Sequence, residues 1–104
     1  MKRNSRLEKE QAWIGDAVLG LFSRAWILKN KNELDAEMFS RMTSNHFLNS
    51  MGQPTKVEAE IGKVYNQKGL EKSFEYIEFK ILPLFLKQEK KINRIKKGKK
   101  YTKV

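Results

Sequence analysis

The sequence predicts an all-α protein, and three observations lead to this prediction. Apolar residues recur at i, i+3 and i+4 spacing along four stretches of the 104-residue chain, which is the period of an amphipathic helix. Gly52, Pro54 and Gly69 lie between three of these stretches, and residues of these types often end helices. No stretch shows the strict apolar–polar alternation of a half-buried strand. We therefore expect one compact helical bundle over residues 1–90, followed by a basic C-terminal tail over residues 91–104.

The first helix is expected from about Leu7 to Leu28, and the polar segment KNKNEL follows it. Its apolar band is wide for a surface helix and consists of Trp13, Ile14, Ala17, Val18, Leu21, Phe22, Ala25, Trp26 and Leu28. A band of this width predicts burial on more than one face. A chain of this size buries only a modest fraction of its surface, so we expect a second copy to cover part of the band.

The second helix is expected over residues 35–51, where Gly52 and Pro54 supply the signal that ends it. Its apolar residues are spaced so that one face of the helix can turn toward a core. These residues are Met38, Phe39, Met42, Phe47, Leu48 and Met51.

The third helix is expected over residues 54–65, in the segment PTKVEAEIGKVY. Thr55 is a plausible N-cap, because Glu58 follows three residues later, at the spacing of a capping box. The fourth helix begins near Leu70, and Pro83 should either kink it or begin a new helix. The apolar face of this last stretch comprises Leu70, Phe74, Ile77, Ile81 and Leu84.

Positive charge is concentrated at the C-terminus. The chain has a net charge of +10, and residues 87–104 hold nine of its 22 basic residues but only one of its 12 acidic residues. Such a tail suits the phosphate backbone of a nucleic acid. A solvated tail and an anionic membrane surface are the alternatives, the latter disfavoured by the few apolar residues. The residues predicted to bind RNA are Lys90, Lys91, Arg94, Lys96, Lys97, Lys99 and Lys100.

Several classes of protein are excluded or disfavoured by what the sequence lacks. There is no cysteine, so disulfides and thiolate metal sites are excluded. The single histidine, His46, is more typical of a surface residue than of a ligand, and no Gly-rich phosphate loop or G-x-S-x-G turn is present. No apolar run approaches the roughly 18 residues of a membrane span, and no secretory segment is apparent. We expect a soluble cytoplasmic protein with no membrane partner.

Carboxylates are the remaining candidates for chemistry. Asp16 lies among apolar residues in QAWIGDAVLG, and a charge there is costly unless it is paired or binds a cation. Glu58 and Glu60 lie on the third expected helix. One acid from each of two facing helices could hold Mg²⁺, which prefers carboxylate oxygens. The alternatives are a solvent-facing Asp16, a capping role for Glu58 and a solvated Glu60.

Two motifs resemble those of the ribonuclease III family. AWIGDAVLG resembles the family's signature helix, VEAEIGKVYNQKGLEKSFEYIEFKILPLF resembles its second motif, and MTSN resembles the short segment between them. Together they cover most of residues 7–86. The resemblance implies a ribonuclease III-like endonuclease domain in which Asp16 and Glu58 are the catalytic, metal-binding acids. It also implies Mg²⁺ or Mn²⁺ as cofactor, double-stranded or structured RNA as substrate, and a homodimer.

The motifs depart from those of full-length ribonuclease III enzymes at identifiable positions. Lys9 and Ala12 stand where those enzymes have acids, and Thr55 stands where they have an aspartate. The short Mini-ribonuclease III relatives also carry alanine in the first motif and a hydroxyl residue in the second, and they also lack a double-stranded-RNA-binding domain. The chain therefore resembles the Mini type more closely. Glu60 falls where the family has an apolar residue, and residues 45–58 form a shorter stretch than in the family's enzymes.

In this family the signature helix forms the two-fold dimer interface, and Gly15 would let another helix approach closely, which we expect to be that of a second subunit. The resemblance places Trp13, Gly15, Val18 and Phe22 at this interface. Three functions remain open. They are a metal-dependent endoribonuclease that processes RNA, a catalytically degenerate RNA-binding or ribosome-associated protein of the same fold, and an unrelated helical dimerisation or scaffold domain.

Overall fold

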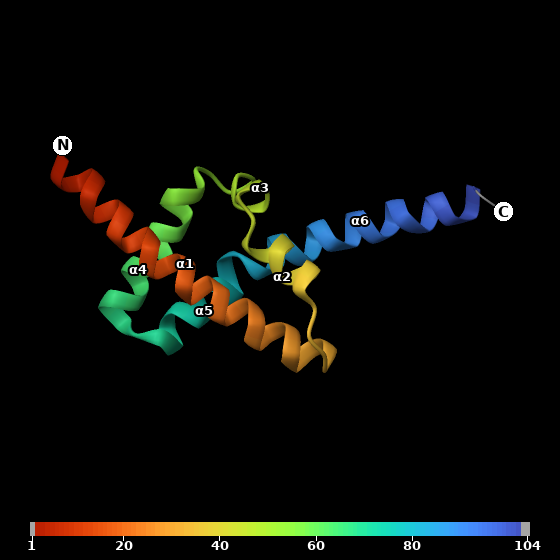
Figure 1. Ribbon diagram of the computed structural model, residues 1–104, viewed down its shortest axis with the longest axis horizontal. Coiled ribbons are helices and arrows are strands. Elements are labelled where there is room, and N and C mark those ends of the chain that lie inside the picture. The colour runs from red at the N-terminus through yellow and green to blue at the C-terminus, as the bar shows by residue number, and fades with distance from the viewer. Residues whose placement is uncertain (1, 103–104) are drawn as a thin grey trace.

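The computed structural model describes the backbone of residues 2–102 and the side chains of residues 6–93. All regular elements within these residues are helices, which confirms the all-α prediction (Figure 1). They are α1 (Lys2–Lys31), α2 (Ala36–Thr43), α3 (Asn45–Leu48), α4 (Pro54–Lys68), α5 (Leu70–Lys80) and α6 (Leu82–Thr102). None of the helices in this part of the chain is both long enough and apolar enough to cross a membrane.

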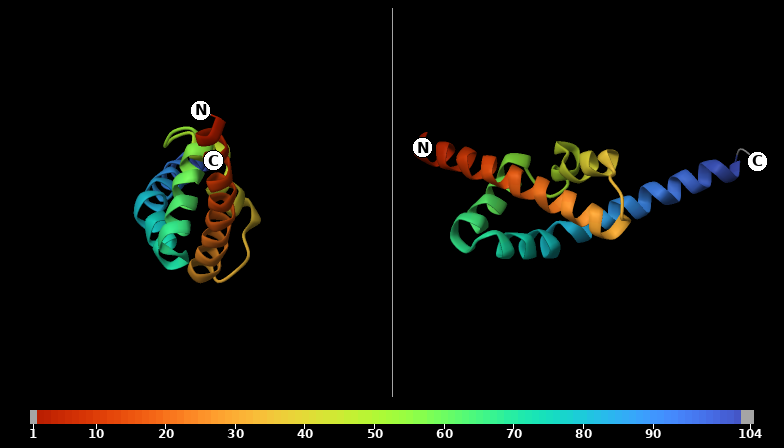
Figure 2. Two further views of the ribbon diagram at one scale, coloured as in Figure 1. Left: turned by 90° about the vertical axis from the view of Figure 1, so that its left-hand side faces the viewer. Right: turned by 60° about the horizontal axis from the view of Figure 1, so that its bottom comes forward.

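The first helix, α1, runs diagonally across the body of the molecule (Figures 1 and 2). Its most extensive contact is with α4, and it also contacts α2 and α5. The apolar core draws residues from every helix, as expected for elements that each bury one face. Its buried members are Val18, Leu19, Phe22, Ile27, Met38, Met42, Phe47, Leu48, Ile61, Ile77, Ile81, Leu82 and Phe85.

Two aromatic pairs join helices that are distant in the sequence. Phe22 of α1 packs edge to face against Phe74 of α5, with ring centroids 5.4 Å apart. Phe47 of α3 meets Phe85 of α6 in the same geometry and at the same separation. An edge-to-face pair adds about 1 kcal/mol beyond the apolar area it buries, so these contacts hold α5 and α6 onto the body.

The single helix expected over residues 35–51 is wrong, because the chain breaks at Ser44 into α2 and α3. Ser44 has an extended backbone, with φ −72° and ψ 149°. Its hydroxyl accepts a hydrogen bond from the backbone N–H of Phe47 at 3.1 Å and so caps α3. Serine hydroxyls compete with helical carbonyl groups for backbone N–H donors in this way. Apolar residues continue at helical spacing through the break, which is why one helix was expected.

The N-cap expected at Thr55 is also wrong. Helix α4 begins at Pro54, as expected, but Gln53 occupies the cap position and makes no side-chain hydrogen bond there. Proline is favoured at the first helical position because its missing N–H would have no partner there. Thr55 therefore lies inside the first turn, and Glu58 is not part of a capping box.

Pro83 begins a new helix, which was one of the two expected outcomes. Helix α5 ends at Lys80, and Pro83 lies in the first turn of α6, where a proline is tolerated. Helix α6 continues past residue 90, where the basic tail was expected to begin, to Thr102. Figure 2 shows that its C-terminal part leaves the body of the molecule.

Candidate functional site

Helices α1 and α4 cross with their backbones in contact, and a glycine on each helix makes this possible. A Cβ atom added at Gly15 would lie 1.7 Å from the carbonyl oxygen of Glu58. A Cβ atom at Gly62 would lie 1.8 Å from the carbonyl oxygen of Gln11. Real Cβ atoms do not approach other atoms so closely, so only glycine fits at either position.

The crossing brings two carboxyl groups together, because Asp16 follows Gly15 directly and Glu58 is the residue that Gly15 touches. Asp16 is exposed, whereas Glu58 is partly buried. Burial, the hydrogen bond with Asp16 and the negative charge of Asp16, in that order, raise the pKa of Glu58 to about 8. Two carboxyl groups this close repel each other when both are ionised. A cation bound between them would relieve that repulsion.

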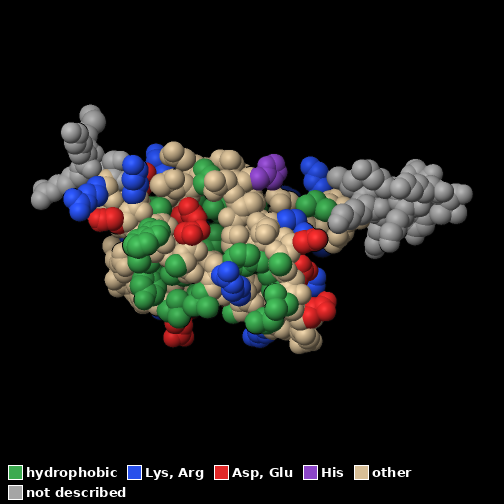
Figure 3. All heavy atoms as spheres, in the orientation of Figure 1, with side chains coloured by type: hydrophobic (Ala, Val, Ile, Leu, Met, Phe, Trp, Pro, Cys, Tyr) green, Lys and Arg blue, Asp and Glu red, His purple; other side chains and the backbone are tan. Residues whose placement is uncertain are grey.

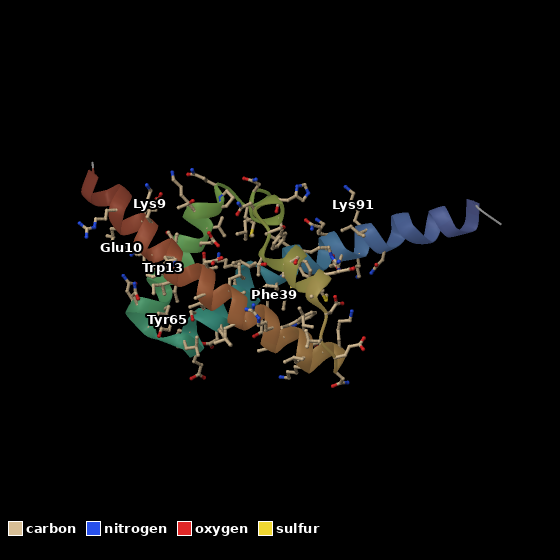
Figure 4. The ribbon with its side chains drawn as sticks, viewed as in Figure 1. Lys9, Glu10, Trp13, Phe39, Tyr65 and Lys91 are labelled. Carbon is tan, nitrogen blue, oxygen red and sulfur yellow. The ribbon has the colours of Figure 1, made fainter. Side chains whose placement is uncertain are left out.

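The acid pair faces a cavity of about 400 Å³, which we call the acid cavity. Its walls come from α1, α4 and the junction between α2 and α3, and Figure 4 labels Lys9 and Trp13 on the α1 side. The lining residues are Lys9, Ala12, Trp13, Asp16, Thr43, Asn45, Thr55 and Glu58. Sequence reasoning did not select Thr43 and Asn45, although the polar segment MTSN that contains them was an available signal.

The donor groups of the acid cavity fit a hard divalent cation. Mg²⁺ is commonly held by one or two carboxylates while it keeps several waters, and Asp16 and Glu58 supply two carboxylates. Thr43 and Thr55 add hydroxyl oxygens to the lining. Among the residues that the structure describes, no group of three or more histidine, cysteine, aspartate or glutamate side chains is gathered for a metal. A cation here would therefore be held by two acids and water.

The raised pKa of Glu58 predicts how stability depends on pH in metal-free protein. The raised pKa lets folded Glu58 hold its proton up to about pH 8, whereas unfolded glutamate, with a pKa of 4.5, loses it earlier. The folded state therefore binds more protons between these values, and the free energy of unfolding falls as the pH rises through them. The expected loss is on the order of 2 kcal/mol, smaller than the full shift implies because the pair is partly solvated.

Urea unfolding in EDTA at pH 5, 6.5 and 8 tests this prediction, with Glu58→Gln as the comparison. Glutamine cannot ionise, so the variant should lack this part of the pH dependence and should be more stable than the parent at pH 8. Parallel stability curves for the two proteins would show that the acids are not coupled.

Other sequence-predicted residues lie away from the acid cavity. Glu60 is exposed and lines a separate groove with Lys56 and Tyr76. Burial, and secondly the charge of Glu60, raise the pKa of Tyr76. His46 is an exposed residue of α3 and does not line the acid cavity.

The explanation of Gly15 by a second subunit is wrong, because α4 of the same chain occupies the space beside it. Val18 and Phe22 are likewise buried in this chain's own core, with 6% and 5% of their surface exposed. Of the four predicted interface residues, only Trp13 is on the surface, with 79% of its surface exposed.

The predicted RNA-binding residues all lie on α6. Lys90 and Lys91 are exposed, and Figure 4 labels Lys91 beyond the body of the molecule. The side chains of the other predicted residues, Arg94, Lys96, Lys97, Lys99 and Lys100, lie outside the described residues.

Comparison of the chain with family models, with curated proteins and with solved structures finds no match. The functional argument therefore depends on the acid pair, its cavity and the surfaces around them.

Proposed function

We propose that this chain is a divalent-metal-dependent endoribonuclease that cleaves double-stranded or structured RNA, with a ribonuclease III-like fold of the Mini type. The observation that carries the proposal is the meeting of Asp16 and Glu58 across the crossing of α1 and α4. The resemblance pairs these two acids at a metal site. They lie on different helices and are 42 residues apart in the sequence.

The lining of the acid cavity supports the same proposal. Lys9, Ala12 and Thr55 stand at the positions where full-length enzymes of the family have further acids. All three line the cavity that contains Asp16 and Glu58. Lys9, Ala12 and Asp16 share one face of α1, and Thr55 and Glu58 share one face of α4, so the crossing of the two helices gathers all five positions around one cavity.

Asp16 and Glu58 would hold Mg²⁺ or Mn²⁺ through their carboxylate oxygens. When bound there, the ion would supply an activated water molecule as nucleophile and positive charge to stabilise the phosphate. Lys9, on the wall of the same cavity, would place a positive charge next to an RNA phosphate. The exposed indole of Trp13 borders the same cavity.

The test is cleavage of a long RNA duplex by the full chain at low salt, with Mg²⁺, with Mn²⁺ and with EDTA. We expect shortened duplex products with either ion and intact RNA in EDTA. Intact RNA under all three conditions would contradict the proposed activity.

A catalytically degenerate RNA-binding protein is the second candidate, and one observation favours it. The acid cavity holds two acids together with the cation of Lys9, and a nearby positive charge weakens the binding of a metal ion. In that case the same assay would show duplex RNA bound but uncut.

We also propose that the chain forms a homodimer through the exposed side of α1. Trp13, Ala17 and Leu21 follow one another at intervals of four residues and are all exposed, so they share a face of the helix. Leu28 continues this face, with 54% of its surface exposed. Figure 3 shows apolar side chains in a broken band across this side of the molecule. Apolar surface of this kind often marks an interface, and contact of the face with its own copy would close it.

Combined replacement of Trp13 and Leu21 by serine should convert a dimeric parent into a monomer, because it removes two of the three large apolar side chains of this face. Sedimentation equilibrium at micromolar concentration measures the effect, and circular dichroism checks the fold. Phe79→Ser is the matched control, since Phe79 is as exposed as Trp13, at 78%, but lies on α5. A monomeric parent would contradict the proposed dimer.

A further inference from the structure

A second hollow lies between α2 and α6, away from the acid pair, and we call it the basic groove. Its volume is about 720 Å³. The lining residues are Lys31, Met38, Arg41, Pro83, Leu86, Lys87, Glu89, Lys90 and Asn93. Four of them are cations that come from three helices, α1, α2 and α6, whereas one is an acid. Lys31 and Arg41 lie on the side formed by α1 and α2, whereas Lys87 and Lys90 lie on the α6 side.

An ion pair fixes the two walls relative to each other. The guanidinium group of Arg41 on α2 donates two hydrogen bonds to the carboxylate of Glu89 on α6, each 2.9 Å long. Both side chains are partly buried, and the contact with Glu89 raises the pKa of Arg41 further. A bidentate ion pair of this kind fixes the relative orientation of the two side chains as well as their distance. It therefore sets the direction in which α6 leaves the body.

Two of the four cations of the groove are available to a ligand. Lys31 is paired with Asp35, and Arg41 is paired with Glu89. Within the described side chains, no ion pair involves Lys87 or Lys90, and both are exposed. They are three residues apart on α6, so they lie on neighbouring turns of one helix face.

We propose that the basic groove is a docking surface for the phosphate backbone of double-stranded RNA, held in shape by the Arg41–Glu89 pair. A nucleic acid presents a closely spaced row of negative charges, and lysines that follow a helix can match such a row. The sequence of α6 contains six more basic residues between Lys90 and Thr102. The inference deepens the proposed function, because it names the surface that would hold the RNA.

The lining of the basic groove favours a nucleic acid over a membrane surface. A membrane surface would require a broad, flat apolar face, whereas Met38, Pro83 and Leu86 lie inside the groove.

The first test measures binding of a fluorescent RNA duplex of about 16 base pairs to the full chain in EDTA, so that no cleavage occurs. Combined Lys87→Glu and Lys90→Glu should weaken binding at least about tenfold at low salt and flatten its salt dependence. Combined Lys68→Glu and Lys72→Glu makes the same change in net charge at the turn between α4 and α5 and should change affinity less than about threefold.

The second test separates the shape of the groove from its total charge. Glu89→Gln makes the chain more positive but breaks the ion pair with Arg41, and we expect weaker RNA binding in spite of the added positive charge. Tighter binding, or equal losses in the two double-lysine variants, would overturn the docking surface. Competition by millimolar inorganic phosphate, or preferential binding to phosphatidylserine vesicles, would also overturn the assignment to RNA. Because these measurements use EDTA, their outcome does not depend on whether the chain cleaves RNA.

Discussion

Gly15→Ala is expected to cost most of the stability of this protein. The added Cβ would lie 1.7 Å from the Glu58 carbonyl oxygen and 2.9 Å from the backbone nitrogen of Gly62. Both neighbours are backbone atoms, which cannot rotate away, so α1 and α4 would have to separate. Overpacking of a rigid contact costs about 3 kcal/mol or more, a large fraction of the stability of a small domain. Urea unfolding followed by circular dichroism measures the loss.

Gly20→Ala is the matched control on the same helix. A Cβ atom there would meet the flexible end of Arg24 at 3.2 Å and the ring of Phe39 at 3.9 Å. The arginine can move, and alanine is favoured over glycine in a helix by about 1 kcal/mol. We therefore expect Gly20→Ala to be neutral or stabilising. An unfolding midpoint for Gly15→Ala equal to that of the parent would show that the two backbones are not in contact.

Asp16→Asn is expected to lower metal-dependent RNA cleavage by at least about 100-fold, which corresponds to about 3 kcal/mol of lost transition-state stabilisation. Asparagine keeps the size of the side chain but removes the charge that would bind the metal ion. Duplex RNA binding in EDTA should stay within about twofold of the parent, because the basic surface on α6 is unchanged. Cleavage rates and binding constants measured on the same preparations separate the two effects.

Glu58→Gln should give the same loss of cleavage, and the two changes together should cost little more than either one alone. Residues that hold one ion act as a unit, so removal of either abolishes the shared contribution. Glu60→Gln is the matched control, because Glu60 lies two residues further along α4, is exposed and does not line the acid cavity. Cleavage by Asp16→Asn at the parental rate would remove Asp16 from the proposed mechanism.

The sequence predicted the helices well where apolar spacing and helix-ending residues agree. Pro83 is an example, since one of its two expected effects, the start of a new helix, is what the structure contains. The break at Ser44 was not predicted, because apolar residues continue at helical spacing on both sides of it. The hydroxyl group of Ser44 causes that break by capping α3. The spacing of apolar side chains gives no information about such a contact.

The two acids of the candidate site were also selected from the sequence, but the partner of Gly15 was not. A glycine on a helix face indicates that another backbone approaches closely there. The sequence pattern does not distinguish a helix of the same chain from a helix of a second copy. Gly62 on α4 was the overlooked signal, because it fits against Gln11 as Gly15 fits against Glu58. Thr43 and Asn45 were missed because the turn that brings them to the acid cavity depends on Ser44.

The contact between backbones at the crossing has a consequence for how this sequence can evolve. The separation of Asp16 and Glu58 along the two helices is fixed by Gly15 and Gly62 and not by the volumes of the core side chains. The apolar core can therefore drift through substitutions of similar size, while an exchange of either glycine would displace the acids. Distant relatives of this chain are expected to keep Gly-Asp on one helix and Glu-x-x-x-Gly on the other, with little else in common.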